Sequence, residues 1–154
     1  MQDAAKIYAV IDTNVVVSSF FSLDGTSSPA VVINAILRGV ITPLYNDAIL
    51  AEYREVLSRP KFPFNGQMVE MIISAIRDFG IDTQRTEVKG EVFPDSDDIV
   101  FYEVKMSMDD AFLVTGNIKH FPKNPLVVTP TEMVEILSKR GLISERSFSG
   151  EKRA

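Results

Sequence analysis

The sequence predicts an α/β fold in which helices cover both faces of a central, mainly parallel sheet, giving three α/β/α layers. Short apolar runs alternate with helical patterns along the chain, as in successive strand–helix units. The first run, KIYAVI at 6–11, is almost continuously apolar, which is typical of a strand buried on both faces. The length of 154 residues fits one domain with a substantial core.

The remaining elements follow from caps, prolines and the spacing of apolar residues. A helix is expected to begin near Val15. Further helices are expected at 30–38, 46–58, 68–80, 98–106 and 130–140. The expected strands are 41–45, 82–88, 111–117 (ending in a turn) and 126–129. Residues 1–142 are expected to form one domain and the small, polar segment 143–154 a mobile tail.

Composition and charge limit the possible functions. No apolar run approaches the roughly 20 residues that span a bilayer, and the N-terminus has no signal-type apolar segment. The chain has no Cys and one His, which excludes thiolate sites and zinc sites built on several His. We therefore expect a cytoplasmic protein without membrane contact. The net charge of −5 argues against a tight, general nucleic-acid binder, although a bound cation reverses the local sign in an acidic pocket.

Polar residues follow two of the expected strands. Asp12 comes directly after the first strand, and the Thr-Gly-Asn turn at 115–117 follows the AFLV strand. In parallel sheets ligands bind beyond the carboxyl ends of the strands, so these residues belong to one edge. Asp12 has a second interpretation as the N-cap of the following helix, a role that Asn14 could share. The two roles of Asp12 are compatible.

A second acid, Glu52, lies on the helix expected at 46–58. Helical periodicity places it at the edge of an apolar stripe centred on Tyr53, while Glu55 points to the opposite side. Glu52 can therefore reach along the packed helix toward the sheet edge. The alternative is an ordinary solvated charge.

The segment PDSDD at 94–98 places three carboxylates at the start of a helix. One interpretation is electrostatic, because the helix dipole favours acids in a first turn by roughly 0.3–1 kcal/mol. Three acids also repel one another, and two unit charges at 4 Å cost about 4 kcal/mol at an effective dielectric constant of 20. If Asp98 faces Asp12 across a cleft, a hard cation such as Mg²⁺ or Mn²⁺ would offset that repulsion.

Two further features near the AFLV strand have alternative interpretations. Asp109 and Asp110 form an acidic pair that can be a surface turn or part of the pocket. Asn117 can orient a metal-bound water or simply shape its turn. His120 can be a surface residue or a substrate contact.

Four stretches, taken in order, resemble the PIN domain, the nuclease fold of the VapC-type toxin ribonucleases. They are VIDTNVVVSSF, LAEYREVLSRPKF, DSDDIVFYEVK and DDAFLVTGNIKHFP, and the resemblance runs over about residues 8–137. It implies acidic site positions at Asp12, Glu52 and Asp98, with Asp95 and Asp97 beside the third. The subgroup that the chain resembles most is that of toxin–antitoxin PIN proteins.

The last stretch departs from the family pattern, which often has a carboxylate directly after Thr-Gly. This chain has Asn117 there. An amide can orient water but brings no charge, so metal affinity and catalytic strength are in question. Asp110 is the candidate to compensate if it points into the pocket.

The resemblance implies metal-dependent hydrolysis of RNA phosphodiesters by a toxin endoribonuclease. The implied catalytic residues are Asp12, Glu52, Asp98 and Asn117, and the implied Mg²⁺ or Mn²⁺ ligands are Asp12, Glu52, Asp98 and Asp110. Candidates for RNA backbone contact are Arg59, Lys61, Lys105 and Lys119, and candidates for base stacking or for core packing are Phe62, Phe64 and Phe121. Expected partners are RNA, an antitoxin protein and further copies of the chain in a homodimer or higher homo-oligomer.

Two other functions remain open. A phosphoacceptor signalling domain would need an Asp at the end of a middle strand and a Lys at the end of a later one. The chain offers Asp47, which fits the first turn of a helix better, and the strand 126–129 ends in Thr and Pro. A PIN-like scaffold that has lost catalysis and binds RNA or a protein is supported by Asn117 and by the acidic pI of about 4.9.

Overall fold

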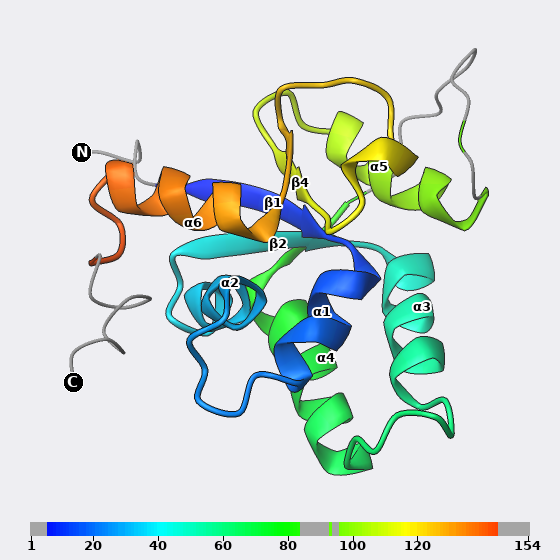
Figure 1. The fold of residues 1–154 in the computed structure, drawn as a ribbon. Helices are drawn as coiled ribbons and strands as arrows, with labels where there is room; N and C mark the ends of the chain where they lie inside the picture. Colours follow the sequence, from blue (N-terminus) through cyan, green and yellow to red (C-terminus); the bar gives the residue numbers. More distant parts are fainter. Residues whose placement is uncertain (1–5, 84–92, 94–95, 145–154) are drawn as a thin grey trace.

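The computed structural model describes residues 6–83, 93 and 96–144, and it contains a sheet of five parallel strands (Figure 1). The strands are β1 (Ile7–Ile11), β2 (Ile41–Tyr45), β3 (Ile81–Asp82), β4 (Phe112–Val114) and β5 (Val127–Val128). Their order across the sheet is β3-β2-β1-β4-β5, and every pairing is parallel. The expected α/β fold with a central parallel sheet is confirmed.

Helices form the outer layers. They are α1 (Thr13–Phe20), α2 (Ser28–Leu37), α3 (Asp47–Leu57), α4 (Gly66–Phe79), α5 (Ile99–Met106) and α6 (Pro130–Lys139). Figure 1 shows α5 on one face of the sheet and α1, α2 and α4 on the other. Two short 3-10 segments, η2 (Ser96–Asp98) and η3 (Ile118–His120), precede α5 and follow β4. None of the described helices is long and apolar enough to cross a bilayer.

The central position of β1 explains its continuous apolar run. It pairs with β2 on one side and β4 on the other, and Ala9, Val10 and Ile11 are completely buried. Full burial of a Val or Ile side chain stabilises the fold by roughly 1.5–3 kcal/mol. The residue that follows such a strand is therefore held in a fixed position at the sheet edge.

Several predicted helix ends are confirmed. Asn46 caps α3 by accepting a hydrogen bond from the Ile49 amide at 2.9 Å. Gly39 follows α2 with a φ of +78°, a conformation that favours glycine. Pro130 stands in the first turn of α6, whose N-terminus is closed by a capping box of Thr129 and Glu132.

The structure differs from the prediction at the start of α1. The helix begins at Thr13 instead of near Val15, and Asp12 is its N-cap. Asn14 lies inside the helix and is not its cap. Some predicted features fall outside the described residues: 84–88 of the expected strand 82–88, Asp95, and 145–154 of the expected mobile tail. The division into a domain at 1–142 and a tail stays a prediction.

Candidate active site

The pairing of β1 with β4 brings two distant polar residues together. Ile11 lies opposite Val114 in the register, and the Asp12 amide extends the ladder by donating to the Val114 carbonyl at 2.9 Å. Asp12 and Thr115, the next residue on each strand, are therefore neighbours at the carboxyl edge of the sheet. The Thr115 hydroxyl donates to Oδ2 of Asp12 at 2.7 Å.

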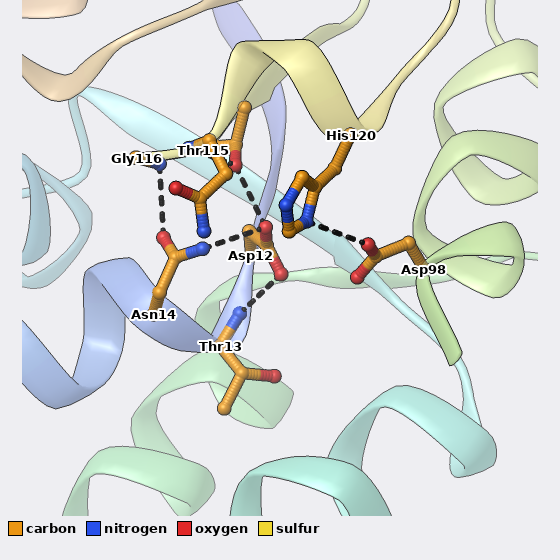
Figure 2. A network of polar contacts seen from close by, with 8 residues as sticks. Asp12, Thr13, Asn14, Asp98, Thr115, Gly116 and His120 are labelled. Atoms are coloured by element: carbon orange, nitrogen blue, oxygen red, sulfur yellow. Dashed lines mark hydrogen bonds and ion pairs between the residues drawn. The ribbon is translucent and has the colours of Figure 1, made fainter. Parts of the chain in front are cut away.

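The Asp12 carboxylate is buried and surrounded by donors (Figure 2). Oδ1 accepts from the Thr13 amide at 2.8 Å, and Oδ2 accepts from Nδ2 of Asn14 at 3.0 Å. Oδ1 of Asn14 in turn accepts from the Gly116 amide at 2.9 Å. A Cβ on Gly116 would lie 3.2 Å from that oxygen, so a glycine suits this close approach. Asn14 thus joins the start of α1 to the turn after β4.

Burial and hydrogen bonding act on Asp12 in opposite directions. With an exposed fraction of 4%, the carboxylate loses most of its hydration, which raises its pKa above the ordinary value. The hydrogen bonds from Thr115, Thr13 and Asn14 and the charge of His120 lower the pKa but do not cancel the effect of burial. A cation beside Asp12 would favour its charged form.

Glu52 reaches the same edge from α3. The neighbouring Tyr53 is buried, and its hydroxyl donates to the Ile11 carbonyl at the end of β1. This bond holds α3 against the strand that carries Asp12. Glu52 is half-buried, and its Oε2 accepts from the Thr13 hydroxyl at 3.4 Å. Burial and then the nearby Asp97 carboxylate raise the pKa of Glu52.

Asp98 enters from the opposite side of the site, where η2 meets α5. Its side chain makes no capping hydrogen bond to α5, so helix capping does not explain its position. The side chain is 15% exposed, and Oδ2 lies 3.3 Å from Nδ1 of His120. In Figure 2 the His120 imidazole lies between Asp12 and Asp98. Of the two interpretations of His120, the structure favours the one that places it at the site.

The acidic side chains described above border one cleft of about 390 Å³. Among the described residues, four carboxylates line it: Asp12, Glu52, Asp97 and Asp98. Asn117 and His120 line it as well, and Arg59, Lys61 and Phe62 form one rim. A groove of about 460 Å³ between α1, α2 and α4 is lined without any titratable side chain. The acidic cleft is therefore the candidate active site.

Comparison with known families identifies the fold. A family model described as the PIN domain matches residues 8–119. The chain belongs to the PIN domain family. PIN domains are generally nucleases that bind metal, which agrees with carboxylates gathered at the edge of a parallel sheet. Searches of curated proteins and of solved structures find no match.

The strand order also separates this PIN domain from phosphoacceptor signalling domains. Their doubly wound sheets have the order 2-1-3-4-5, whereas the order here is β3-β2-β1-β4-β5. Asp47 is exposed in the first turn of α3 rather than at a strand end. The topology therefore does not support the phosphoacceptor alternative.

Two predicted site residues of the PIN domain lie elsewhere. Asp110 precedes β4, so it lies at the amino end of that strand, whereas Asp12 follows the carboxyl end of β1. The structure does not bring Asp110 to the cleft, and we leave it out of the candidate metal ligands. Lys105 is 2% exposed. Burial lowers its pKa, and the charges of Asp109 and Asp110 offset only part of that effect. Lys105 is therefore not a candidate for RNA contact.

Other predicted contacts divide between the cleft and the core. Lys119 lines a hollow that adjoins the cleft and shares Asn117 and His120 with it. Phe121 is buried, and Phe64 packs partly buried against the core. Phe62 is the predicted stacking candidate that lines the cleft.

Three contacts of the site were not predicted. They are the hydrogen bond from the Thr115 hydroxyl to Asp12, the hydrogen bond from the Gly116 amide to Asn14, and the contact between His120 and Asp98. The sequence did indicate the position of Thr115, because Thr115 directly follows β4 as Asp12 directly follows β1. The other two depend on side-chain directions that a single sequence does not specify.

The donor set of the cleft fits a hard divalent cation in its chemistry. Carboxylate and amide oxygens are the ligands that Mg²⁺ and Mn²⁺ prefer. Burial raises the pKa of both Asp12 and Glu52, and the Asp97 carboxylate raises that of Glu52 further. Within the described residues, no three acidic or His side chains are yet grouped as a metal site would require. Asp98 faces His120, so its carboxylate would have to turn to join Asp12 on one ion.

Proposed function

We propose that this PIN domain is a metal-dependent endoribonuclease that hydrolyses phosphodiester bonds in RNA. The observation that carries the proposal is the meeting of four carboxylates, Asp12, Glu52, Asp97 and Asp98, in one cleft at the carboxyl edge of the sheet. Asp12 directly follows β1, Glu52 lies on α3, and Asp97 and Asp98 lie in η2. Such a concentration of negative charge supports cation binding better than direct binding of a polyanion.

Each residue of the cleft has a proposed role. Asp12, Glu52 and Asp98 would hold Mg²⁺ or Mn²⁺, directly or through waters. Such an ion supplies an activated water and stabilises charge on the attacked phosphate. Thr115 and Asn14 hold the Asp12 carboxylate in place through their hydrogen bonds. The amide of Asn117 would orient the attacking water.

We also propose that the enzyme is the toxin of a toxin–antitoxin pair. The support is the likeness of its four sequence stretches to toxin PIN proteins. This proposal includes an antitoxin protein as partner, a homodimer or higher homo-oligomer, and a location in the cytoplasm. A growth assay with and without expression of the enzyme tests the toxin role, and co-purification from the source cells tests for an antitoxin partner. Equal growth with and without the enzyme would contradict the toxin role.

RNA cleavage with Mn²⁺ and with EDTA, on the parent and on Asp12→Asn, tests the enzyme. We expect the parent to cut RNA in Mn²⁺ and to stop in EDTA, while Asp12→Asn stays folded and loses cleavage. Circular dichroism of the variant provides the folding control. Cleavage by Asp12→Asn at the parental rate would show that the acidic cleft is not the active site.

The second candidate is a PIN scaffold that binds RNA or a protein without cutting. Two observations favour it: Asn117 stands where many PIN domains have a carboxylate, and Asp98 faces His120 rather than Asp12. Calorimetric titration with Mn²⁺ separates the two candidates. No measurable heat of binding, together with intact RNA in the cleavage assay, would favour the scaffold.

A further inference from the structure

One rim of the acidic cleft is aromatic and basic. Four phenylalanines, Phe20, Phe21, Phe62 and Phe64, form a cluster that we call the aromatic rim. Phe62 and Phe64 are nearly parallel, with ring centroids 5.1 Å apart and an interplanar angle of 7°. Phe21 approaches both rings, with its centroid 6.1 Å from Phe62 and 5.1 Å from Phe64, and Phe20 lies 4.7 Å from Phe64.

The aromatic rim has a buried side and an open side. Phe20 and Phe64 pack against the hydrophobic core. Phe21 is 54% exposed, and Phe62 is partly exposed and lines the cleft beside the carboxylates. The core therefore anchors the cluster through Phe20 and Phe64, and Phe62 packs on Phe64 at the cleft. A partly exposed ring at such a position is available for stacking.

A cation accompanies the ring. The Lys61 ammonium lies over the Phe62 ring, 5.2 Å from its centroid, where the contact is a weak cation–π interaction. The other basic residue of the rim, Arg59, forms a two-pronged ion pair with Glu55 at 2.8 and 3.1 Å. In a protein of net charge −5, Lys61 thus supplies positive charge at the rim of the acidic cleft.

We propose that Phe62 stacks on a base next to the bond to be cut and that Lys61 contacts the adjoining phosphate. This inference rests on the proposed nuclease function and adds specificity-determining residues to it. A base that takes the place of the Lys61 ammonium on the ring releases that ammonium for the phosphate. An aromatic ring binds the face of an unpaired base, which a duplex does not present. The substrate is therefore unpaired at this position.

Fluorescence anisotropy with a labelled, unstructured RNA strand in Mg²⁺ tests the proposal. Asp98→Asn is the background, because it is expected to stop cleavage and leave the rim intact. On this background we compare Phe62→Leu, which removes the ring, with Phe62→Trp, which restores one. Phe79→Leu is the matched control, since Phe79 is an exposed ring at the end of α4 and is not part of the cleft lining.

We expect Phe62→Leu to weaken binding by about 5–150-fold, the range of one base–aromatic stack. Phe62→Trp should restore binding, and Phe79→Leu should leave it unchanged. A strand with abasic sites should bind weakly and be insensitive to Phe62→Leu, and a duplex of the same sequence should bind more weakly than the single strand.

Three results would overturn the stacking role. They are parental affinity of Phe62→Leu, equal weakening of normal and abasic strands, and tighter binding of the duplex. Cleavage by the parent is measured in parallel in Mn²⁺. If the parent cuts RNA while Phe62→Leu binds normally, stacking is wrong and the nuclease proposal stands. If the parent does not cut and no strand binds, both proposals fail.

Discussion

The hydroxyl of Thr115 donates a hydrogen bond of 2.7 Å to Asp12, a residue 103 positions earlier in the chain. The bond exists because β1 and β4 are parallel neighbours, and each residue directly follows its strand. Hydrogen bonds to ionised groups stabilise by roughly 1.5–3 kcal/mol. The direction of the Asp12 carboxylate is thus set partly by its neighbours Thr13 and Asn14 and partly by a residue from a distant segment of the chain.

Removing that hydroxyl should impair the site without enlarging any cavity. Thr115→Val keeps the side-chain shape but leaves Asp12 with one donor fewer, so the pKa of Asp12 should increase further. We expect Mn²⁺ affinity and RNA cleavage to fall by on the order of 10–100-fold, as for other residues that support metal ligands. Calorimetry and initial rates provide the measurement. Thr131→Val, at an exposed position on α6, is the control, and equal effects of the two variants would contradict the role of Thr115.

The raised pKa of Asp12 predicts how stability depends on pH. Between the ordinary pKa of 3.8 and the higher folded value, the folded protein keeps a proton that the unfolded chain releases. The free energy of unfolding due to this group therefore falls as pH rises through that interval and levels off above it. Asp12→Asn removes the dependence, so the stability of the variant relative to the parent should increase as pH rises above the ordinary pKa of 3.8 and then level off.

Urea denaturation at several pH values measures this difference. Asp24→Asn is the control of opposite sign, because hydrogen bonds from Thr26 lower the pKa of Asp24. The stability of that variant relative to the parent should decrease as pH rises toward the ordinary pKa of 3.8, which lies below the interval in which Asp12 acts. The same trend for both variants would show that burial of Asp12 does not control its protonation.

Two acids on α3 provide a matched pair. Glu52 lines the cleft, whereas Glu55 is exposed and pairs with Arg59 at 2.8 Å. Glu52→Gln should lose Mn²⁺ binding and cleavage, since it removes one of the four carboxylates. Glu55→Gln should keep both, since it breaks only a surface ion pair worth about 0–1 kcal/mol. Calorimetry and the cleavage assay compare the two variants, and full activity of Glu52→Gln would remove Glu52 from the site.

The chain contains a single His, so nuclear magnetic resonance can follow the His120 imidazole without assignment. Mg²⁺ binding should draw the Asp98 carboxylate away from Nδ1 of His120, which now lies 3.3 Å from Oδ2. We expect the imidazole signals to shift during a Mg²⁺ titration of the parent and to stay in place for Asp12→Asn. Unchanged signals in a parent that binds Mg²⁺ by calorimetry would mean that Asp98 does not turn.

Asn117 offers a gain-of-function test. It lines the cleft but brings no charge, so Asn117→Asp adds a fifth carboxylate to the four already there. We expect tighter Mn²⁺ binding, because the added charge attracts the ion more strongly than it repels the other acids once the ion is present. Asn34→Asp, exposed on α2, adds the same charge elsewhere and should leave the affinity unchanged in calorimetry.

Much of the fold could be predicted because local chemistry determines it. The continuous apolar run at 6–11 predicted a central strand, and β1 is central and completely buried over Ala9–Ile11. The cap Asn46 and the stripe around Tyr53 predicted α3, whose apolar residues Ile49, Leu50, Tyr53 and Leu57 are buried. The predicted start of α1 near Val15 is two residues late, whereas the predicted N-cap role of Asp12 is confirmed.

The sequence predicted which residues lie at the same edge of the sheet, but not which side chains contact one another. Strand direction places Asp12 and the turn at 115–117 on one edge, and the same rule places Asp110 on the other, although it is nearer to Thr115 in the chain. The meeting of Asp12 with Thr115 requires the register of two strands, which the sequence does not specify. The contact of Asp98 with His120 requires side-chain directions, which depend on the packing of both segments.

The pairing of β1 with β4 also affects the order of events during synthesis. The first acid of the cleft is made at residue 12, but the strand beside it and the hydroxyl that directs it are made only at residues 112–115. A ribosome-bound chain that ends before residue 112 contains the acidic residues of the cleft but lacks β4 and Thr115, which position Asp12. The cleft can therefore assemble only after most of the chain has been translated, and chains truncated before β4 lack a complete cleft.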